Sequence, residues 1–283
     1  MSTAEDSVSL PRVTVVIPVR NGERHIAAAL ESVLSQQDID LDVIVSENFS
    51  TDGTADVLRH IADPRLRVVQ PPQACSAADN WSFVTGLATG EFTKLVCHDD
   101  LLYPGALAAQ AQALERDHSI AIVASRRCIV DAAGEVVLAA RGLAGLRGRV
   151  EGPAAIARMV RGGTNIFGEP AAVLFRTSAL QVALPWNPSH PYVIDVELYA
   201  RILRTHALFA DPDVRAAFRI GHASWSSQLR AEQATSFQWL ASRERAELGL
   251  PIWALAEGIA RAWVAQFARQ GVFWLAARRR ARS

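Results

Sequence analysis

Two adjacent carboxylates, Asp99 and Asp100, follow the apolar run "FTKLVC" at residues 92–97. Like charges on neighbouring residues repel each other, so such a pair favours water or a bound cation. Carboxylate oxygens are hard ligands that suit Mg²⁺ or Mn²⁺, and these ions commonly bridge to substrate phosphates. We therefore predict a divalent-metal site at these two residues, within a site for a phosphate-bearing substrate.

Two further apolar runs, at residues 13–19 and 41–45, also end in polar residues. The polar residues are Arg20, Asn21, Glu23 and Glu47. Both runs are continuous rather than alternating, which is typical of strands buried on both faces of a parallel sheet. Ligands bind at the carboxyl ends of such strands, so we expect these polar residues and the aspartates to share one site.

Strands and helices alternate along the first half of the chain. The run "LRVVQ" (66–70) predicts a further strand. Apolar residues at helical spacing predict helices over 26–34, 55–61 and 77–88, with Asn21 capping the first, and another helix begins at Pro104. This alternation predicts an α/β fold with a doubly wound, mostly parallel sheet and helices on both faces.

Two common phosphate-binding motifs are absent from the sequence. No GxGxxG stands between the first strand and its helix, and no GxxxxGK[ST] occurs. Gly142, Gly145 and Gly148 are spaced by three but follow no strand-to-helix pattern, and they predict a flexible loop. We therefore expect a metal and side chains, rather than a glycine-rich loop, to hold the phosphate.

The composition restricts the class of protein. Half of the 283 residues are hydrophobic, which supplies a sizeable core, and the 29 basic and 29 acidic residues balance. This balance argues against a nucleic-acid partner. The three cysteines form no CxxC pair, the N-terminus "MSTAEDSVSLPR" does not resemble a signal peptide, and no apolar run approaches the roughly 18 residues that span a bilayer. We expect a cytoplasmic protein.

Four blocks of the sequence together resemble the family 2 inverting glycosyltransferases, which have the GT-A fold. The blocks are "VTVVIPVRNGERHIAAALESVLSQ", "DVIVSENFSTDGT", "NWSFVTGLATGEFTKLVCHDDLLYPGAL" and "DVELYARIL". The resemblance implies a metal-dependent, inverting transfer of a sugar from a nucleotide-diphosphate sugar to a sugar or lipid-linked acceptor, in cell-surface polysaccharide or glycoconjugate synthesis. It also implies a glycosyltransferase domain at 10–230, with a nucleotide-binding half (10–131) and an acceptor-binding half (150–230), followed by a helical extension at 231–283.

The resemblance assigns roles to individual residues. Those implied to bind the donor are Pro18, Val19, Arg20, Asn21, Glu23, Glu47, Asn80 and Asp99. Those implied to bind Mg²⁺ or Mn²⁺ are Asp99, Asp100 and His222. The sequence leaves open which aspartate faces the metal, and whether His222 is a ligand or a surface residue. Four residues depart from the family pattern: Arg20 replaces an aromatic residue, Glu47 an aspartate, Asp79 an arginine, and Cys97 the first aspartate of a DxD motif.

A second group of carboxylates lies in the latter half of the chain. Asp195 and Glu197 stand at the start of the predicted helix "YVIDVELYARIL" (192–203), where the helix dipole alone favours acidic residues. The resemblance implies that Asp195 is the catalytic base, which takes the proton of the acceptor hydroxyl. Glu169, in "GEPAAVLFR" (168–176), either faces the site or is a solvated turn residue.

The C-terminal segment predicts long helices that carry tryptophan and arginine, among them Trp253, Trp263, Trp274 and Arg278–Arg280. Such a helix packs on the domain with a solvated basic tail, which is the interpretation we favour, or it lies on an anionic membrane. In the membrane case the acceptor is plausibly lipid-linked.

Two other functions compete with the glycosyltransferase. A sugar-1-phosphate nucleotidyltransferase is also an α/β enzyme with metal-binding aspartates, but it needs a glycine-rich basic loop after the first strand, and "PVRNGERH" has one glycine. A non-catalytic nucleotide-sugar-binding module is consistent with the departures from the family pattern at Arg20, Glu47 and Cys97. The retained Asp99, Asp100 and Asp195 weigh against it.

Overall fold

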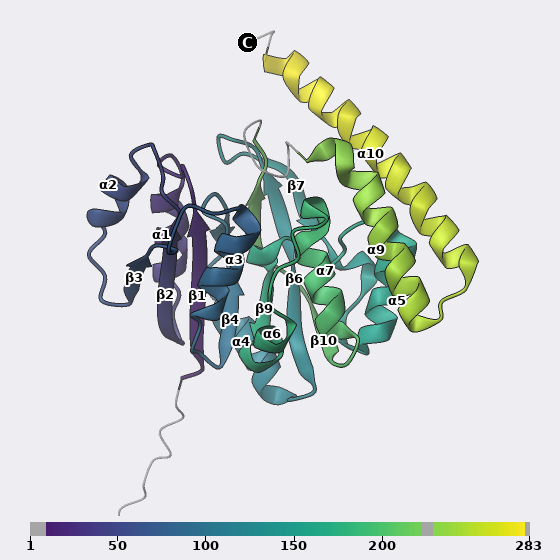
Figure 1. Ribbon diagram of the computed structural model, residues 1–283, viewed down its shortest axis with the longest axis horizontal. Coiled ribbons are helices and arrows are strands. Elements are labelled where there is room, and N and C mark those ends of the chain that lie inside the picture. The colour runs from purple at the N-terminus through teal and green to yellow at the C-terminus, as the bar shows by residue number, and fades with distance from the viewer. Residues whose placement is uncertain (1–9, 222–228, 281–283) are drawn as a thin grey trace, which may run out of the picture.

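The computed structural model describes residues 10–221 and 229–280, which form a ten-stranded sheet covered by helices (Figure 1). The strands are β1 (Arg12–Val19), β2 (Asp40–Glu47), β3 (Leu66–Val69), β4 (Phe92–Leu95), β5 (Leu101–Leu102), β6 (Ile120–Val130), β7 (Val136–Arg141), β8 (Gly148–Val150), β9 (Val173–Arg176) and β10 (Ala207–Arg219). Their order is β3-β2-β1-β4-β9-β6-β10-β5, with β7 paired to β6 and β8 paired to β10.

The longest strand pairings are parallel. β1 pairs in parallel with β2 and β4, β2 with β3, and β6 with β10. The central strand β9 runs antiparallel to both of its neighbours, β4 and β6. The predicted α/β class and mostly parallel sheet are therefore confirmed, with one antiparallel strand joining the two halves.

The helices cover both faces of the sheet. They are α1 (Ile26–Leu34), α2 (Thr54–Arg59), α3 (Ala77–Gly86), α4 (Ala106–Arg116), α5 (Gly152–Gly162), α6 (Thr177–Ala183), α7 (Ile194–Leu203), α9 (Gln233–Leu248) and α10 (Ile252–Arg280), with short 3-10 turns η1 (Leu143–Gly145), η2 (Pro170–Ala172), η3 (Pro191–Val193) and η4 (Arg230–Glu232). Alternate side chains of β1 enter two cores: Val15 and Ile17 pack with α1, α2 and α4, whereas Val16 packs with α3 and α5 to α7.

Three local predictions were wrong. Asn21 does not cap α1, because its backbone is left-handed (φ 56°) and its side chain binds the turn at Thr51. Helix α4 begins at Ala106, after Gly105 in a left-handed conformation, so Pro104 lies outside the helix. The strand from Phe92 ends at Leu95 rather than at residue 97.

The glycine-rich stretch at 142–148 also differs from the prediction. It includes the turn η1 and the first residue of β8 instead of a flexible loop. Gly142, Gly145 and Gly148 all have positive φ, at 125°, 86° and 63°. Glycine adopts these angles without steric cost, so the spacing of the three residues reflects backbone turns and not a phosphate-binding motif.

Candidate active site

The loops after β1, β2 and β4 lie together at one edge of the sheet. In the β1–β2 pairing Val19 is opposite Glu47, and β4 pairs with the other side of β1. A Cβ added to Gly22 would lie 2.7 Å from Cδ2 of His98, so the loop after β1 touches the loop that carries the aspartates. The structure thus brings the predicted donor and metal residues to a single edge.

Glu47 lies in a pocket of about 380 Å³ at the ends of β2 and β3. The lining residues are Glu47, Ala55, Leu58, Arg59, Val68, Val69 and Gln70. Glu47 accepts hydrogen bonds from the Ser50 backbone N–H (2.6 Å) and from Gln70 Nε2 (2.7 Å). Burial alone raises the pKa of Glu47, but these hydrogen bonds outweigh it and hold the pKa below its ordinary value. Glu47 therefore presents a charged acceptor in this pocket.

Asn21 and Glu23 hold the turn that follows β2. Asn21 Oδ1 accepts a hydrogen bond from the Thr51 backbone N–H at 2.8 Å, and Glu23 Oε2 accepts one from the Gly53 N–H at 3.0 Å. Both residues were predicted to bind the donor. In the structure their oxygens hold the loop beside the Glu47 pocket. Their contribution to donor binding would therefore include shaping this loop.

The remaining donor-binding candidates surround the ends of β1 and β2. Pro18 and Val19 are buried within β1, and Arg20 beyond them is exposed. Asn80, on α3, is buried and accepts a 2.5 Å hydrogen bond from the Ser46 hydroxyl. Of these four, only Arg20 presents its side chain freely to solvent at the edge of the sheet.

The paired aspartates differ in their surroundings. Asp100 is fully buried, whereas Asp99 is partly exposed. Asp100 Oδ1 accepts a hydrogen bond from the backbone N–H of Arg219 (3.1 Å), and Arg219 Nε donates to the Asp99 carbonyl (3.1 Å). Asp100 Oδ2 is buried without a hydrogen-bond partner. Burial first, and then the charge of Asp99, raise the pKa of Asp100 well above its ordinary value.

This pair fits a hard divalent cation. A buried carboxylate oxygen without a donor is costly, and a cation beside it would stabilise both negative charges. Among residues 10–221 and 229–280, no group of three or more His, Cys, Asp or Glu side chains is placed to hold a metal. Mg²⁺ commonly binds through one or two carboxylates and completes its shell with substrate phosphates and water, so two protein ligands suffice. His222, the third predicted ligand, lies outside the described residues.

Asp195 stands in the first turn of α7 and is 9% exposed. Its Oδ2 accepts a hydrogen bond from Asn165 Nδ2 at 2.8 Å, and its Oδ1 accepts one from the Val196 backbone N–H at 2.7 Å. The Asn165 amide cannot be turned around, because its Oδ1 accepts bonds from the N–H groups of Phe167 and Gly168, each at 3.0 Å. The carboxylate of Asp195 is therefore held in one orientation.

Glu169, beside Asp195, forms a bidentate ion pair with Arg127. Arg127 Nη2 lies 3.0 Å from Glu169 Oε1, and Arg127 Nε contacts the other oxygen. The Arg127 side chain is 1% exposed and that of Glu169 is 24% exposed. Burial, followed by the charge of Glu169, raises the pKa of Asp195 to about 7, while Arg127 opposes this shift. Of the two interpretations of Glu169, the structure supports the one in which it faces the site.

The pKa of Asp195 predicts a pH dependence. Below about pH 7 the carboxyl is largely protonated and cannot accept a proton, so the kcat/KM of an enzyme that uses Asp195 as its general base should rise with pH through this range. Glu169→Gln removes the negative charge that raises this pKa, so the rising limb should move to lower pH. The measurement is a pH–rate profile of both proteins. A limb that stays in place, or moves upward, would contradict the assignment of Asp195 as the titrating base.

Glu197, the alternative to Asp195, points elsewhere. It is 2% exposed and forms ion pairs with Arg201 (3.0 Å) on its own helix and with Arg243 (2.7 Å) on α9. Two arginines therefore satisfy this carboxylate, which leaves it little capacity to accept a proton. The spacing of two residues on α7 sends the two acids to different faces of the helix.

Four residues at or near the site were not singled out from the sequence: Gln70, Arg127, Asn165 and Arg219. Arg219 lies 119 residues from Asp100, and Asn165 lies 30 residues from Asp195. Asn165 follows two glycines in "GGTNIFGEP", which is a turn signal, but the signal does not name its partner. Arg127 is a charged residue inside the apolar run of β6, and a buried charge of this kind predicts a paired carboxylate.

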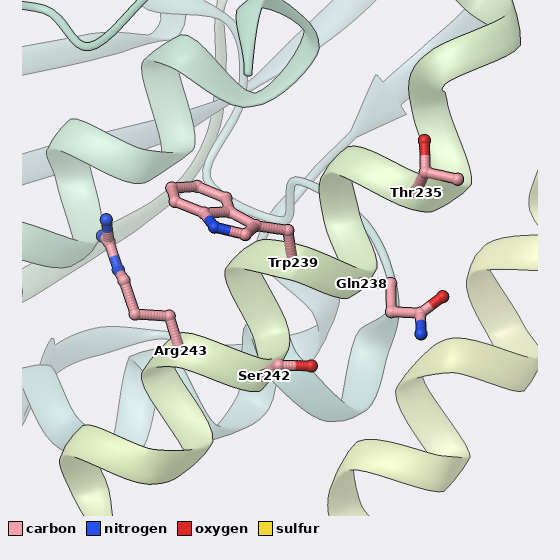
Figure 2. A pocket seen from close by; sticks show the side chains of 5 residues that line it. All are labelled: Thr235, Gln238, Trp239, Ser242 and Arg243. Atoms are coloured by element: carbon pink, nitrogen blue, oxygen red, sulfur yellow. The ribbon is translucent and has the colours of Figure 1, made fainter. Parts of the chain in front are cut away.

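A larger hollow lies on helix α9. Its volume is about 700 Å³, and Figure 2 shows its lining residues, Thr235, Gln238, Trp239, Ser242 and Arg243, all on this one helix. The Trp239 ring stacks on His190 at 4.0 Å, and Arg243 lies 4.9 Å from its centroid. The hollow contains no candidate for the chemistry described above, so we place the active site at the carboxylates and not here.

Comparison with known proteins gives the family. The model of glycosyl transferase family 2 matches residues 14–182, more than half of the chain. Chondroitin synthase from Escherichia coli is 30% identical over 131 residues, which are 45% of this chain and 19% of that relative; the match thus spans about a fifth of the length of that enzyme.

Two solved structures share the fold. Staphylococcus aureus TarS 1-349, in complex with UDP-GlcNAc, superposes with a TM-score of 0.70 at 17% identity, over 89% of this chain and 73% of that one. The mannosyltransferase PcManGT from Pyrobaculum calidifontis, in complex with GDP-Man and Mn²⁺, gives 0.60 at 18% identity, over 95% and 81%. With this fold and the family match, the chain belongs to glycosyl transferase family 2 and is a glycosyltransferase of the GT-A fold.

Proposed function

We propose that this enzyme transfers a sugar from a nucleotide-diphosphate sugar to an acceptor hydroxyl with inversion, using Mg²⁺ or Mn²⁺. The observation that carries the proposal is that two groups of carboxylates both lie near one residue, Cys97. Burial first, and then the charges of Asp100, Asp99, Asp195 and Glu169, raise the pKa of the Cys97 thiol well above its ordinary value. The charges of the aspartate pair and of Asp195 therefore reach the same residue, which supports a single site that contains both.

The Asp99–Asp100 pair and Asp195 suit the leaving group and the attacking group of a displacement reaction. Asp99 and Asp100 would hold the divalent ion, which when bound offsets the charge that develops on the leaving diphosphate. Asp195, fixed by Asn165, would take the proton of the acceptor hydroxyl as that oxygen attacks the sugar. Glu47 and the residues of its pocket would bind the nucleoside, with the exposed Arg20 stacking on the base. A single in-line displacement of this kind inverts the anomeric configuration.

The matched proteins support this choice of substrates. One structural neighbour is described with UDP-GlcNAc and another with GDP-Man and Mn²⁺, which supports a nucleotide-sugar donor and a divalent metal. The relative named chondroitin synthase supports a role in the synthesis of a polysaccharide or glycoconjugate. A sugar or lipid-linked acceptor fits this role. The cysteines Cys75, Cys97 and Cys128 are free thiols, which supports the proposed cytoplasmic location.

We also propose that residues 10–230 form the catalytic unit and that 231–283 extend it. Its nucleotide-binding half would be 10–131 and its acceptor-binding half 150–230. The ion pairs of Arg243 with Glu197 and of Arg204 with Glu244 (both 2.7 Å) attach α9 of the extension to α7, the helix of Asp195. Glu244 is fully buried, so the extension stabilises the helix that bears the base.

A donor screen tests the proposed function. The full chain, incubated with UDP-, GDP-, TDP- and CDP-sugars, should release nucleoside diphosphate from one of them in the presence of Mn²⁺ or Mg²⁺. EDTA should abolish the release, and an added acceptor saccharide or glycolipid should increase it. Pyrophosphate release from a sugar 1-phosphate and a nucleoside triphosphate would instead indicate a nucleotidyltransferase. Donor binding without turnover on any acceptor would indicate a binding module on this scaffold.

A further inference from the structure

Helix α10 packs on the domain through its smallest residues. Ala254 and Ala262 are 2% and 1% exposed, and the three positions 254, 258 and 262 recur every four residues, on one face of the helix. A Cβ added to Gly258 would lie 1.9 Å from the carbonyl oxygen of Val160 on α5. The backbones of the two helices are therefore in close contact, and this face of α10 is fixed against the protein.

Four large apolar residues of α10 lie on the outside. Ile252 is 63% exposed, Trp253 57%, Trp263 40% and Val264 69%. We call these four residues the apolar face of α10. Figure 1 shows α10 as the outermost helix beside α9, with its C-terminal part continuing past the first turns of α9. In an ordinary surface helix the large apolar residues face the core and polar residues face water; here Leu255 packs against the core, but the four residues of the apolar face point away from it.

The apolar face adjoins a strongly basic segment. Residues 258–283 contain six arginines and no aspartate or glutamate, whereas the whole chain has equal numbers of basic and acidic residues. In the sequence, Phe267 and Trp274 follow Trp263 at distances of 4 and 11 residues, which are near-whole numbers of helical turns. Three of the seven tryptophans of the chain stand in this helix. Tryptophan and arginine together are typical of helices that lie in the interfacial region of a membrane.

We propose that the apolar face of α10 docks on the surface of an anionic lipid bilayer, with the helix lying in the plane of the membrane. Within the described residues, no helix is long and apolar enough to cross a membrane, so contact at the surface is the form of binding that this helix permits. The arginines would interact with anionic headgroups, each contributing on the order of 1 kcal/mol near the surface. A second copy of the chain fits this face less well, because pairing would bring two arginine-rich segments together.

The test uses two variants of the full chain and two kinds of vesicle. Ile252→Glu/Val264→Glu places acids on the apolar face, at positions too exposed to disturb the core. Val182→Glu is the matched control, because Val182 is 89% exposed on α6. Flotation is measured with vesicles of phosphatidylcholine alone and of phosphatidylcholine with phosphatidylglycerol in equal amounts.

We expect wild type and Val182→Glu to float with the anionic vesicles, less so in high salt, and weakly with neutral ones. The double variant should bind at least about tenfold more weakly, because two aliphatic side chains no longer enter the bilayer and the new carboxylates are repelled by the anionic headgroups. Truncation after Gln270 should also reduce flotation while leaving nucleotide binding intact. Equal flotation of the double variant and wild type, or no flotation of wild type at low salt, would overturn the proposal. So would a wild-type dimer in sedimentation velocity that the double variant abolishes without any binding to vesicles.

Discussion

Asp195→Asn is expected to lower transferase turnover by about 10²- to 10⁴-fold, the usual range for loss of a general base, with donor affinity close to wild type. Asparagine keeps the size of the side chain and part of its hydrogen bonding to Asn165 and Val196. It cannot take the proton of the acceptor hydroxyl at neutral pH. The donor would be held by the metal and the Glu47 pocket, which the substitution does not touch. Turnover is followed as nucleoside diphosphate release, and donor affinity by calorimetry.

Glu197→Gln serves as the control for this experiment. Glu197 is bound by Arg201 and Arg243, so its loss should lower thermal stability through the α7–α9 contact more than it lowers turnover per folded molecule. Full activity of Asp195→Asn, or a larger catalytic loss in Glu197→Gln at equal stability, would reject Asp195 as the base. NMR of the product gives an independent check, because retention of the anomeric configuration is incompatible with a single displacement.

Asp99→Ala and Asp100→Ala should each weaken Mn²⁺-dependent donor binding by at least about 10- to 100-fold. Loss of residues that only support metal ligands typically costs that much, and these two are the proposed ligands themselves. Asp100→Ala is expected to have the further effect of removing the acceptor for the Arg219 backbone N–H, so Asp100→Asn is included to keep that hydrogen bond.

Calorimetric titration of the donor in Mn²⁺ and in EDTA measures this effect. Asp213→Ala, on the same strand as Arg219 but 65% exposed, is the control for general loss of negative charge and should bind like wild type. Suppose that wild type binds the donor equally well in Mn²⁺ and in EDTA, and that both aspartate variants bind it like wild type. The pair then does not bind a metal, and the lack of a partner for the buried Asp100 oxygen has another cause.

The local pattern of the sequence was sufficient to predict the strands β1 to β4, the helices α1 to α3 and the edge where the polar residues meet. β1 and β2 each begin within one residue of the start of the predicted run. The agreement is close because a strand buried on both faces needs a continuous apolar run. Glu47 ends β2, and Asp99 and Asp100 lie in the loop that follows β4. Parallel pairing of β1 with β2 and β4 brings these positions to one edge of the sheet.

The extent of each turn was less predictable. Asparagine is common both as a helix N-cap and as a left-handed turn residue. At Asn21 the hydrogen bond from Thr51, in the next loop, fixes the turn conformation. Gly142, Gly145 and Gly148 have a spacing that suits either a loop or a series of tight turns. The structure resolves this through their positive φ angles, which follow from the path between β7 and β8.

By itself, then, the sequence determined the fold class and the family and indicated the acidic residues of the proposed site, because these depend on apolar periodicity and on residues close together in the chain. Only the tertiary structure decided the partner of each acid. The strand β9 inserts between β4 and β6, and this arrangement carries Glu169 to Arg127 across 42 residues and Asn165 to Asp195 across 30. Glu197 likewise forms ion pairs with Arg201 on α7 and with Arg243 on α9, which packs on α7. Asp195 has no part in these ion pairs and lies at the proposed active site. The physical reason is that a carboxylate's charge state and role depend on burial and on the charges around it, and those come from segments whose approach no local pattern encodes.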